Sequence, residues 1–212
     1  MNRRRAARIW LSVLALSPVV ACAETPLLVD ADNSSGFALY RSGRLSRAEV
    51  GEICRLGVEE ILVLDGGAEE RECRFRRQEC PGLAVRYNLT QDADSPVSAS
   101  FLQAFDAWID EARREGKKVA FRCRHGWHRA GRLAAYYRIR FDAATVEEAK
   151  REMHEIGRLM ARHPTLDSQV QAYADSSAGR PCSTAQEHCV ALEPDPGAPS
   201  GRFPADVCGE SR

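Results

Sequence analysis

Lysine is scarce in this chain of 212 residues, and the formal charges sum to zero at pH 7. Only Lys117, Lys118 and Lys150 are lysine among the 30 basic residues, and 30 acidic residues balance them. A neutral balance removes the usual electrostatic argument for a nucleic-acid or anionic-membrane partner. The positive charge is nearly all guanidinium, the group that suits bidentate contact with phosphate or carboxylate.

The sequence also lacks an internal repeat and an apolar run long enough to span a membrane. Its longest apolar run, residues 9–20, has about a dozen residues, whereas a membrane-spanning helix needs about 20. Residues 3–8 before this run carry four arginines, and the small residues Ala21-Cys22-Ala23 follow it. This pattern predicts a secretory signal peptide over residues 1–23, with an uncleaved anchoring helix as the alternative.

Cys22 adds a second form of export. The run Val19-Val20-Ala21-Cys22 is similar to a bacterial lipobox, in which this cysteine would be lipidated and become the first mature residue. We therefore expect an exported protein, periplasmic or secreted, and both the soluble and the lipid-anchored forms remain open. Membrane contact is expected only through this lipid. Cleavage removes four arginines and no acidic residue, so the mature chain is mildly acidic.

The sequence holds eight cysteines, of which seven would remain after cleavage. Export places them where disulfides form, and an odd number predicts three bridges and one free thiol, with fifteen connectivities open. Cys182, Cys189 and Cys208 lie in a Gly-, Pro- and Ser-rich tail, residues 178–212, which we expect to be ordered only if disulfides staple it. The alternative, a zinc site with His188, lacks the close paired spacing of zinc modules.

Residues 33–177 read as one α/β domain. Short apolar runs alternate with helical periodicity, which predicts a mostly parallel sheet of four to five strands flanked by helices. Ser46 and Glu49 form a capping-box pattern at one helix start. A polar loop, residues 91–100, follows the third strand. We expect strands at 37–41, 61–64, 83–89 and 119–121, and helices at 46–56, 68–79, 98–115, 130–141, 146–162 and 166–174.

The segment from Cys123 to Arg129 carries the predicted chemistry. It follows the last strand directly and opens a helix, and ligands of parallel sheets bind at such strand ends. The N–H groups and positive dipole of a helix start favour an anion and favour a thiolate over a thiol. Gly126 permits a tight turn, and the Arg129 guanidinium can hold two phosphate oxygens. This segment is therefore predicted to bind phosphate and attack it.

The spacing of cysteine and arginine alone is not specific, because Cys80 and Arg86 repeat it. That second pair has Pro81 after the cysteine and no central glycine, so it is interpreted as a coincidence. The prediction rests on the combination of a strand, the cysteine, Gly126, Arg129, Gly131 and a helix.

The run Val119–Gly131 resembles the phosphate-binding loop of cysteine-dependent protein tyrosine and dual-specificity phosphatases, whose usual form is His-Cys-x2-Gly-x2-Arg-Ser/Thr-Gly. Leu39–Gly43 is similar to the opening strand of small bacterial members. The resemblance covers about residues 37–173, and the tail has no counterpart in it. Further similar segments are Leu56–Leu64, Tyr137-Arg138, Glu147–Ala149, Glu152-Met153 and His163-Pro164.

This resemblance implies a dual-specificity-phosphatase-like fold and a phosphomonoester hydrolase that needs no metal or cofactor. The Cys123 thiolate would displace the alcohol or phenol to give a phosphocysteine, and Arg129 would stabilise the equatorial oxygens until water releases phosphate. Phosphorylated protein and small phosphomonoesters both fit as substrates. The other loop residues expected to bind the substrate are Arg124, His125, Gly126, Trp127, His128 and Ala130.

In this family an aspartate on a mobile loop, some thirty residues before the cysteine, protonates the leaving group. Asp92 lies 31 positions before Cys123 and Asp94 lies 29 positions before it. Both are candidates and Asp92 is favoured. The alternative is that they are ordinary loop aspartates.

Three positions depart from the family pattern. Arg122 replaces the histidine before the nucleophile, Ala130 replaces the hydroxyl residue that assists departure of the thiolate, and His128 stands where relatives often have Asp or Asn. These changes predict slowed turnover, and they motivate an alternative function, a pseudophosphatase that binds phosphorylated ligands. Together with Arg124 and Arg129, Arg122 and Arg132 are expected to concentrate positive charge at the phosphate.

Two other enzyme classes use a similar loop. Rhodanese-type sulfurtransferases also begin their loop with Cys-Arg, but their second arginine comes one residue earlier, where this chain has His128. Low-molecular-weight phosphatases place the cysteine early in the domain, whereas Cys123 follows the candidate acids. Cys123, His125 and His128 could also be a metal constellation, but their spacing suits no common site.

Overall fold

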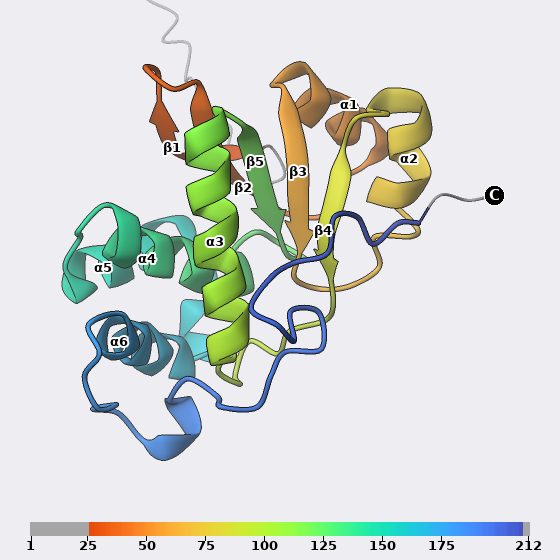
Figure 1. Ribbon diagram of the computed structural model, residues 1–212. Coiled ribbons are helices and arrows are strands. Elements are labelled where there is room, and N and C mark those ends of the chain that lie inside the picture. The colour runs from red at the N-terminus through yellow and green to blue at the C-terminus, as the bar shows by residue number, and fades with distance from the viewer. Residues whose placement is uncertain (1–25, 210–212) are drawn as a thin grey trace, which may run out of the picture.

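The computed structural model describes residues 26–209, so the predicted signal peptide and Cys22 lie outside the described residues. Five strands form one sheet in the order β1-β2-β5-β3-β4 (Figure 1). The last four of these run parallel, and β1 pairs antiparallel with β2. The strands are β1 (Leu27–Asp32), β2 (Phe37–Ser42), β3 (Val58–Val63), β4 (Ala84–Asn88) and β5 (Lys118–Arg122). The predicted α/β class with a mostly parallel sheet is confirmed.

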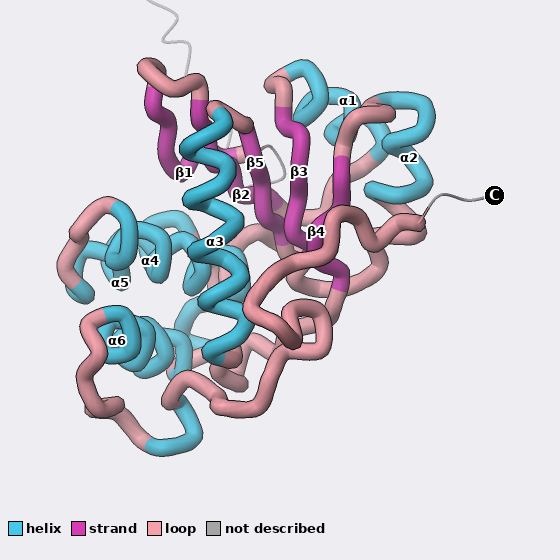
Figure 2. The backbone as a smooth tube through the Cα atoms, in the orientation of Figure 1, coloured by secondary structure: helices cyan, strands magenta, loops and turns pink. Residues whose placement is uncertain are grey.

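Helices cover both faces of this sheet (Figure 2). They are α1 (Arg47–Arg55), α2 (Glu72–Glu79), α3 (Ala99–Glu115), α4 (Arg129–Phe141), α5 (Val146–Ile156) and α6 (Thr165–Ser177). Strand residues alternate between two cores, because successive side chains point to opposite faces. Leu62 and Phe121 pack with α3 and α4, whereas Ile61 and Ala120 pack with α1 and α2. Helices α5 and α6 pack on α4 around Met153 and Leu166.

Strand β1, which precedes the range 33–177, was not predicted from the sequence. Its sequence, LLVDAD, contains two aspartates, a residue type depleted in strands. Val29 points into the core, while Asp30 accepts hydrogen bonds from the Tyr137 hydroxyl (2.5 Å) and the Arg113 guanidinium (3.1 Å). Tertiary partners therefore stabilise a strand that its composition disfavours.

Local signals explain most helix ends. The Ser46 hydroxyl accepts the N–H of Glu49, whose carboxylate accepts the N–H of Ser46, so the predicted capping box is present. The helix predicted over 146–162 ends at Ile156, because Gly157 takes an extended conformation and a separate 3₁₀ turn, Met160–Arg162, follows. The helix predicted over 68–79 begins only at Glu72. No helix within residues 26–209 has the length and apolar character needed to cross a membrane.

Three disulfides join Cys54 to Cys80, Cys73 to Cys208 and Cys182 to Cys189. Cys123 is a free thiol, which confirms the expected division into three bridges and one free cysteine. The tail thiols that were considered as zinc ligands with His188 are thus oxidised. Within residues 26–209, no three His, Cys, Asp or Glu residues are placed to hold a metal ion together.

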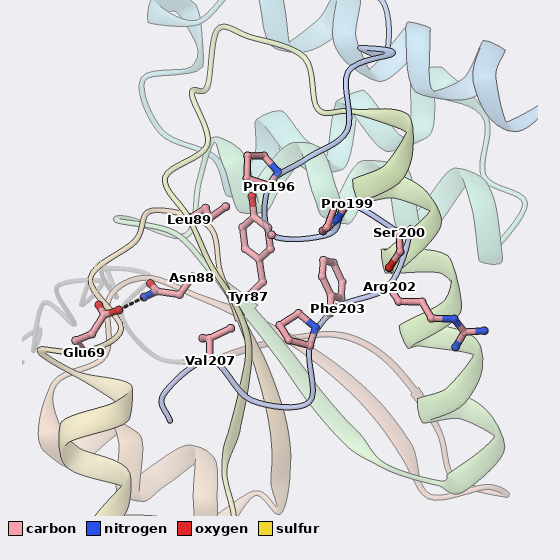
Figure 3. Close-up of a pocket in the computed structure, with 12 residues that line it drawn as sticks. Glu69, Tyr87, Asn88, Leu89, Pro196, Pro199, Ser200, Arg202, Phe203 and Val207 are labelled. Atoms are coloured by element: carbon pink, nitrogen blue, oxygen red, sulfur yellow. Dashed lines mark hydrogen bonds between the residues drawn. The ribbon is translucent and has the colours of Figure 1, made fainter. Parts of the chain in front are cut away.

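The tail packs against the edge of the sheet. The Val207 N–H donates to the carbonyl of Val85 on β4 (2.7 Å), and the disulfide at Cys208 fixes the tail to α2. Figure 3 shows Phe203 and prolines of the tail lying around the Tyr87 ring. These residues line a cavity of about 570 Å³. Phe203 also meets Phe101 edge-on at 5.5 Å between ring centroids. The tail thus covers β4, an edge strand that would otherwise offer unpaired backbone groups.

Candidate active site

The loop between β5 and α4 rests on the end of β2. The N–H of Cys123 donates to the carbonyl of Ser42 (3.3 Å), and the N–H of Arg44 donates to the carbonyl of Arg124 (3.2 Å). Gly126 has φ +73°, and a Cβ atom there would come within 2.8 Å of the carbonyl carbon of Ser42. Only glycine fits this left-handed, close-packed position without strain.

Cys123 lies at the base of the loop. Its side chain is 2% exposed, and it belongs to the same apolar cluster as Ala130 in the first turn of α4. Helix α4 has thirteen residues and begins at Arg129, so the thiol lies just before its N-terminus. That end carries partial positive charge and favours an anion.

A cavity of about 600 Å³ opens on this loop. Cys123, Gly126 and Ala130 are buried and do not line it. The other predicted substrate-binding residues, Arg124, His125, Trp127 and His128, do line the cavity. Its lining residues are Thr90, Gln91, Asp92, Ala93, Arg124, His125, Trp127, His128, Arg129, Leu159, Arg162 and His163.

Arg129 is held at the wall of this cavity by backbone carbonyls. Its Nη1 donates to Leu64 O (3.2 Å), just after β3, and to Gln91 O (3.1 Å), in the loop after β4. Carbonyls that follow two parallel strands therefore fix one edge of the guanidinium. A fixed, planar guanidinium suits bidentate binding of phosphate.

An aromatic wall borders the cavity. The Trp127 ring stacks on His125 at 5.2 Å between centroids, and the Arg158 guanidinium lies 5.6 Å from the centre of the same ring. Burial lowers the pKa of His125, and the neighbouring Arg124 lowers it further. Burial also lowers the pKa of His128. Both imidazoles therefore favour the neutral form at pH 7, and arginines supply the positive charge of the rim.

The two candidate acids face different partners. Asp92 lines the cavity, and its carboxylate accepts the N–H of Asp94 and the hydroxyl of Ser95, both at 3.0 Å. The N–H of Asp94 is the main cause that lowers the pKa of Asp92. The Asp94 carboxylate instead lies 3.0 Å from Nδ1 of His163 and accepts the hydroxyl of Thr165 (3.2 Å).

The loop that carries both aspartates is clamped by Arg132, which is 1% exposed. Its Nη1 donates to Ser95 O (2.6 Å), Ala93 O (3.2 Å) and the side chain of Gln169 on α6 (2.6 Å). The tail also holds this segment, because the N–H of Ala191 donates to Val97 O (3.0 Å). Arg132 does not line the cavity, because its guanidinium faces carbonyls of the loop, but its charge contributes to the lowered pKa of Asp92.

The expectation that Arg122 charges the phosphate site is wrong, because this arginine is fully buried and paired with carboxylates. Its Nε and Nη2 donate to the two carboxylate oxygens of Glu72, both at 2.7 Å, and its Nη1 donates to Asp65. Asp65 also accepts Nε of Arg44 (2.7 Å). Arg122 is thus neutralised on the α2 side of the sheet. Sequence reasoning missed Asp65, although it directly follows a buried strand parallel to β5.

No protein-family model matches the sequence, and no curated protein does. Among solved structures, the chain is similar to TpbA of P. aeruginosa, with a TM-score of 0.53 and 23% identity over 71% of this chain and 96% of that one. A glycine-to-alanine variant of Tk-PTP matches with a TM-score of 0.57 and 20% identity, over 73% of this chain and 97% of that one. The kinase associated phosphatase KAP matches with a TM-score of 0.52 and 15% identity, over 68% of this chain and 89% of that one. The fold predicted from the loop resemblance is confirmed.

Proposed function

Because the chain has the fold of cysteine-dependent tyrosine and dual-specificity phosphatases, we propose that it hydrolyses phosphomonoesters through a phosphocysteine intermediate. The observation that carries the proposal is the loop itself. It places a free thiol before the start of α4 and fixes Arg129 at the wall of the adjoining cavity. TpbA has been solved in complex with phosphotyrosine. This supports phosphorylated protein as a substrate, and small phosphomonoesters fit the same chemistry.

The proposed reaction has two steps. The Cys123 thiolate attacks phosphorus, the ester P–O bond breaks, and the leaving oxygen takes a proton from Asp92. Arg129 and loop N–H groups stabilise the charge on the equatorial oxygens. Water then attacks the phosphocysteine, and the thiolate departs as inorganic phosphate is released.

Asp92 is the better placed acid, because it shares the cavity with Arg129 while Asp94 is paired with His163. In the conformation described, the N–H of Asp94 favours ionised Asp92. A phosphate dianion in the cavity opposes that effect, since a nearby negative charge raises the proton affinity of a carboxylate. Substrate binding therefore favours the protonated form of Asp92, which the leaving group needs.

The first prediction separates the two acids. We expect Asp92→Asn to lower kcat by about 10²-fold for phosphotyrosine peptides, and to remove the fall in activity with rising pH that deprotonation of an acid causes. Asp94→Asn is the matched control, with near-normal kcat. The measurement is phosphate release across a pH series. The reverse ranking would assign the role to Asp94.

Phosphate release from p-nitrophenyl phosphate and phosphopeptides, under reduction mild enough to keep the disulfides, tests the function itself. Binding without release would reject the hydrolase and support the pseudophosphatase. Thiosulfate turnover that depends on Cys123 would instead support the sulfurtransferase.

Ala130 gives the second prediction. It is fully buried in the first turn of α4 and offers no hydroxyl to the departing thiolate. We therefore expect hydrolysis of the phosphocysteine to limit turnover and p-nitrophenol to appear in a burst. Ala130→Ser should raise the steady-state rate about tenfold, the effect of one hydrogen bond to a charged group. Ala134→Ser, one turn later and equally buried, is the control. A wild-type enzyme without a burst would contradict this reasoning.

We also propose that the protein is exported, as its N-terminal sequence predicts. The three disulfides support this, since such bonds persist mainly in oxidising compartments.

A further inference from the structure

We propose that Arg41 is a positioning residue that orients the peptide after Gly126 toward the phosphate and supplies a counter-charge to the Cys123 thiolate. This inference rests on the proposed function and assigns a role to a residue outside the loop. Arg41 lies near the end of β2, where it pairs with Phe121 of β5. Its side chain is 1% exposed.

The contact that orients the loop is a single hydrogen bond. Nη2 of Arg41 donates to the carbonyl oxygen of Gly126 at 2.7 Å. The C=O and the following N–H of a trans peptide point in opposite directions. Because Arg41 draws the Gly126 carbonyl toward β2, the N–H of Trp127 is directed away from β2. Backbone N–H groups aimed to one side of a loop form an anion-binding concavity.

The charge of Arg41 has few partners. Its Nε and Nη1 are buried without a hydrogen-bond partner among residues 26–209, and no carboxylate in that range lies within ion-pair distance of it. By contrast, Arg122, which follows the partner of Arg41 in β5, forms ion pairs with two carboxylates. An uncompensated buried cation is costly. Arg41 therefore gains stability from any anion that forms beside it.

Arg41 pairs with Phe121, and Cys123 comes two positions after Phe121, so the side chains of Arg41 and Cys123 lie on the same face of the sheet. Cys123 in its thiolate form is such an anion. Burial lowers the pKa of the Arg41 guanidinium, and the charges of Cys123 and then Glu152 oppose that effect. The coupling is reciprocal, since a cation stabilised by the thiolate stabilises the thiolate by the same free energy. Other charged groups line the cavity or act on Arg41, so the test must change Arg41 alone. They are Arg129 of α4, Arg124 and His125 of the loop, Asp92 after β4 and Glu152 of α5.

The experiment measures the rate at which iodoacetamide labels Cys123 as a function of pH, by peptide mass spectrometry of the unreduced protein. We expect Arg41→Met to raise the midpoint of the profile by about one pH unit, which is about a tenfold lower rate below it. Arg41→Lys retains the charge and should give the same midpoint as the wild type. Arg113→Met, a partly buried arginine at the opposite end of the sheet, is the control and should leave the midpoint unchanged.

Inorganic phosphate supplies the second readout, because bound phosphate protects Cys123 from labelling. Arg41→Met should need about tenfold more phosphate for half protection. Arg41→Gln is a second uncharged variant, and its side chain ends two bonds short of Nη2, so it loses both the charge and the hydrogen bond to the Gly126 carbonyl. It should match Arg41→Met in both readouts, and it carries the test if Arg41→Met does not fold.

An unmoved pH midpoint in a folded, uncharged Arg41 variant would overturn the counter-charge role. Unchanged phosphate protection in Arg41→Met would overturn the orienting role. Labelling needs no turnover, so a shifted profile in a protein that releases no phosphate would reject the proposed function and leave the role of Arg41 standing.

Discussion

Replacing Cys123 by serine should lower the rate of phosphate release by at least about 10⁴-fold, the scale of losing a nucleophile. A serine hydroxyl is not ionised at neutral pH, whereas a cysteine thiol at a helix N-terminus can be, so the variant lacks the attacking anion. The change removes chemistry with little change of shape. Cys123→Ser should therefore still bind phosphotyrosine peptides.

The same substitution identifies the intermediate. Rapid quenching of the wild type during the burst should give a phosphorylated peptide that contains Cys123, and Ala130 should lengthen the lifetime of that species. Cys123→Ser should give no such peptide. Residual turnover within tenfold of the wild type would show that the thiol is not the nucleophile.

The loop was predictable because its parts are contiguous. Seven residues from Cys123 to Arg129 carry the thiol, the glycine turn and the arginine, and the flanking apolar run and helical periodicity place them at a strand end. The helix cap at Ser46 was predictable for the same reason, since both of its hydrogen bonds join residues three apart. Such local signals need no knowledge of the tertiary fold.

The different surroundings of Asp92 and Asp94 were not predictable, because they depend on distant residues. The two aspartates are two positions apart in one polar loop, and their contexts in the sequence are alike. They differ in the structure because His163, 69 positions later, reaches Asp94. The pairing of Cys73 with Cys208 across 135 positions likewise depends on where the tail crosses β4.

The departure at Arg122 shows the same limit most clearly. Sequence alone placed its charge at the phosphate, since it adjoins the nucleophile. Side chains alternate along a strand, however, so a residue next to Cys123 points to the opposite side of the sheet. There it meets Glu72 and Asp65, which the chain supplies 50 and 57 positions earlier. The arginine and its two carboxylates form one buried unit behind the loop.

Arg122→Met should therefore destabilise the protein by about 3–5 kcal/mol, because it leaves two carboxylates buried without their cation. Urea unfolding with the disulfides intact measures the loss. Arg122→His, which restores the family residue, should recover little, because one imidazole cannot donate to both oxygens of Glu72 and to Asp65 at once.

The control for this prediction removes the whole unit. A triple variant with Arg122→Met, Glu72→Gln and Asp65→Asn has no buried charge in this network, and we expect it to regain most of the lost stability, as replaced buried ion pairs often do. If the triple variant is as unstable as Arg122→Met, shape and hydrogen bonding rather than charge hold α2 against β5. If it is stable but its Cys123 is labelled with an altered pH midpoint, the network also acts on the nucleophile, and its place behind the loop is functional as well as structural.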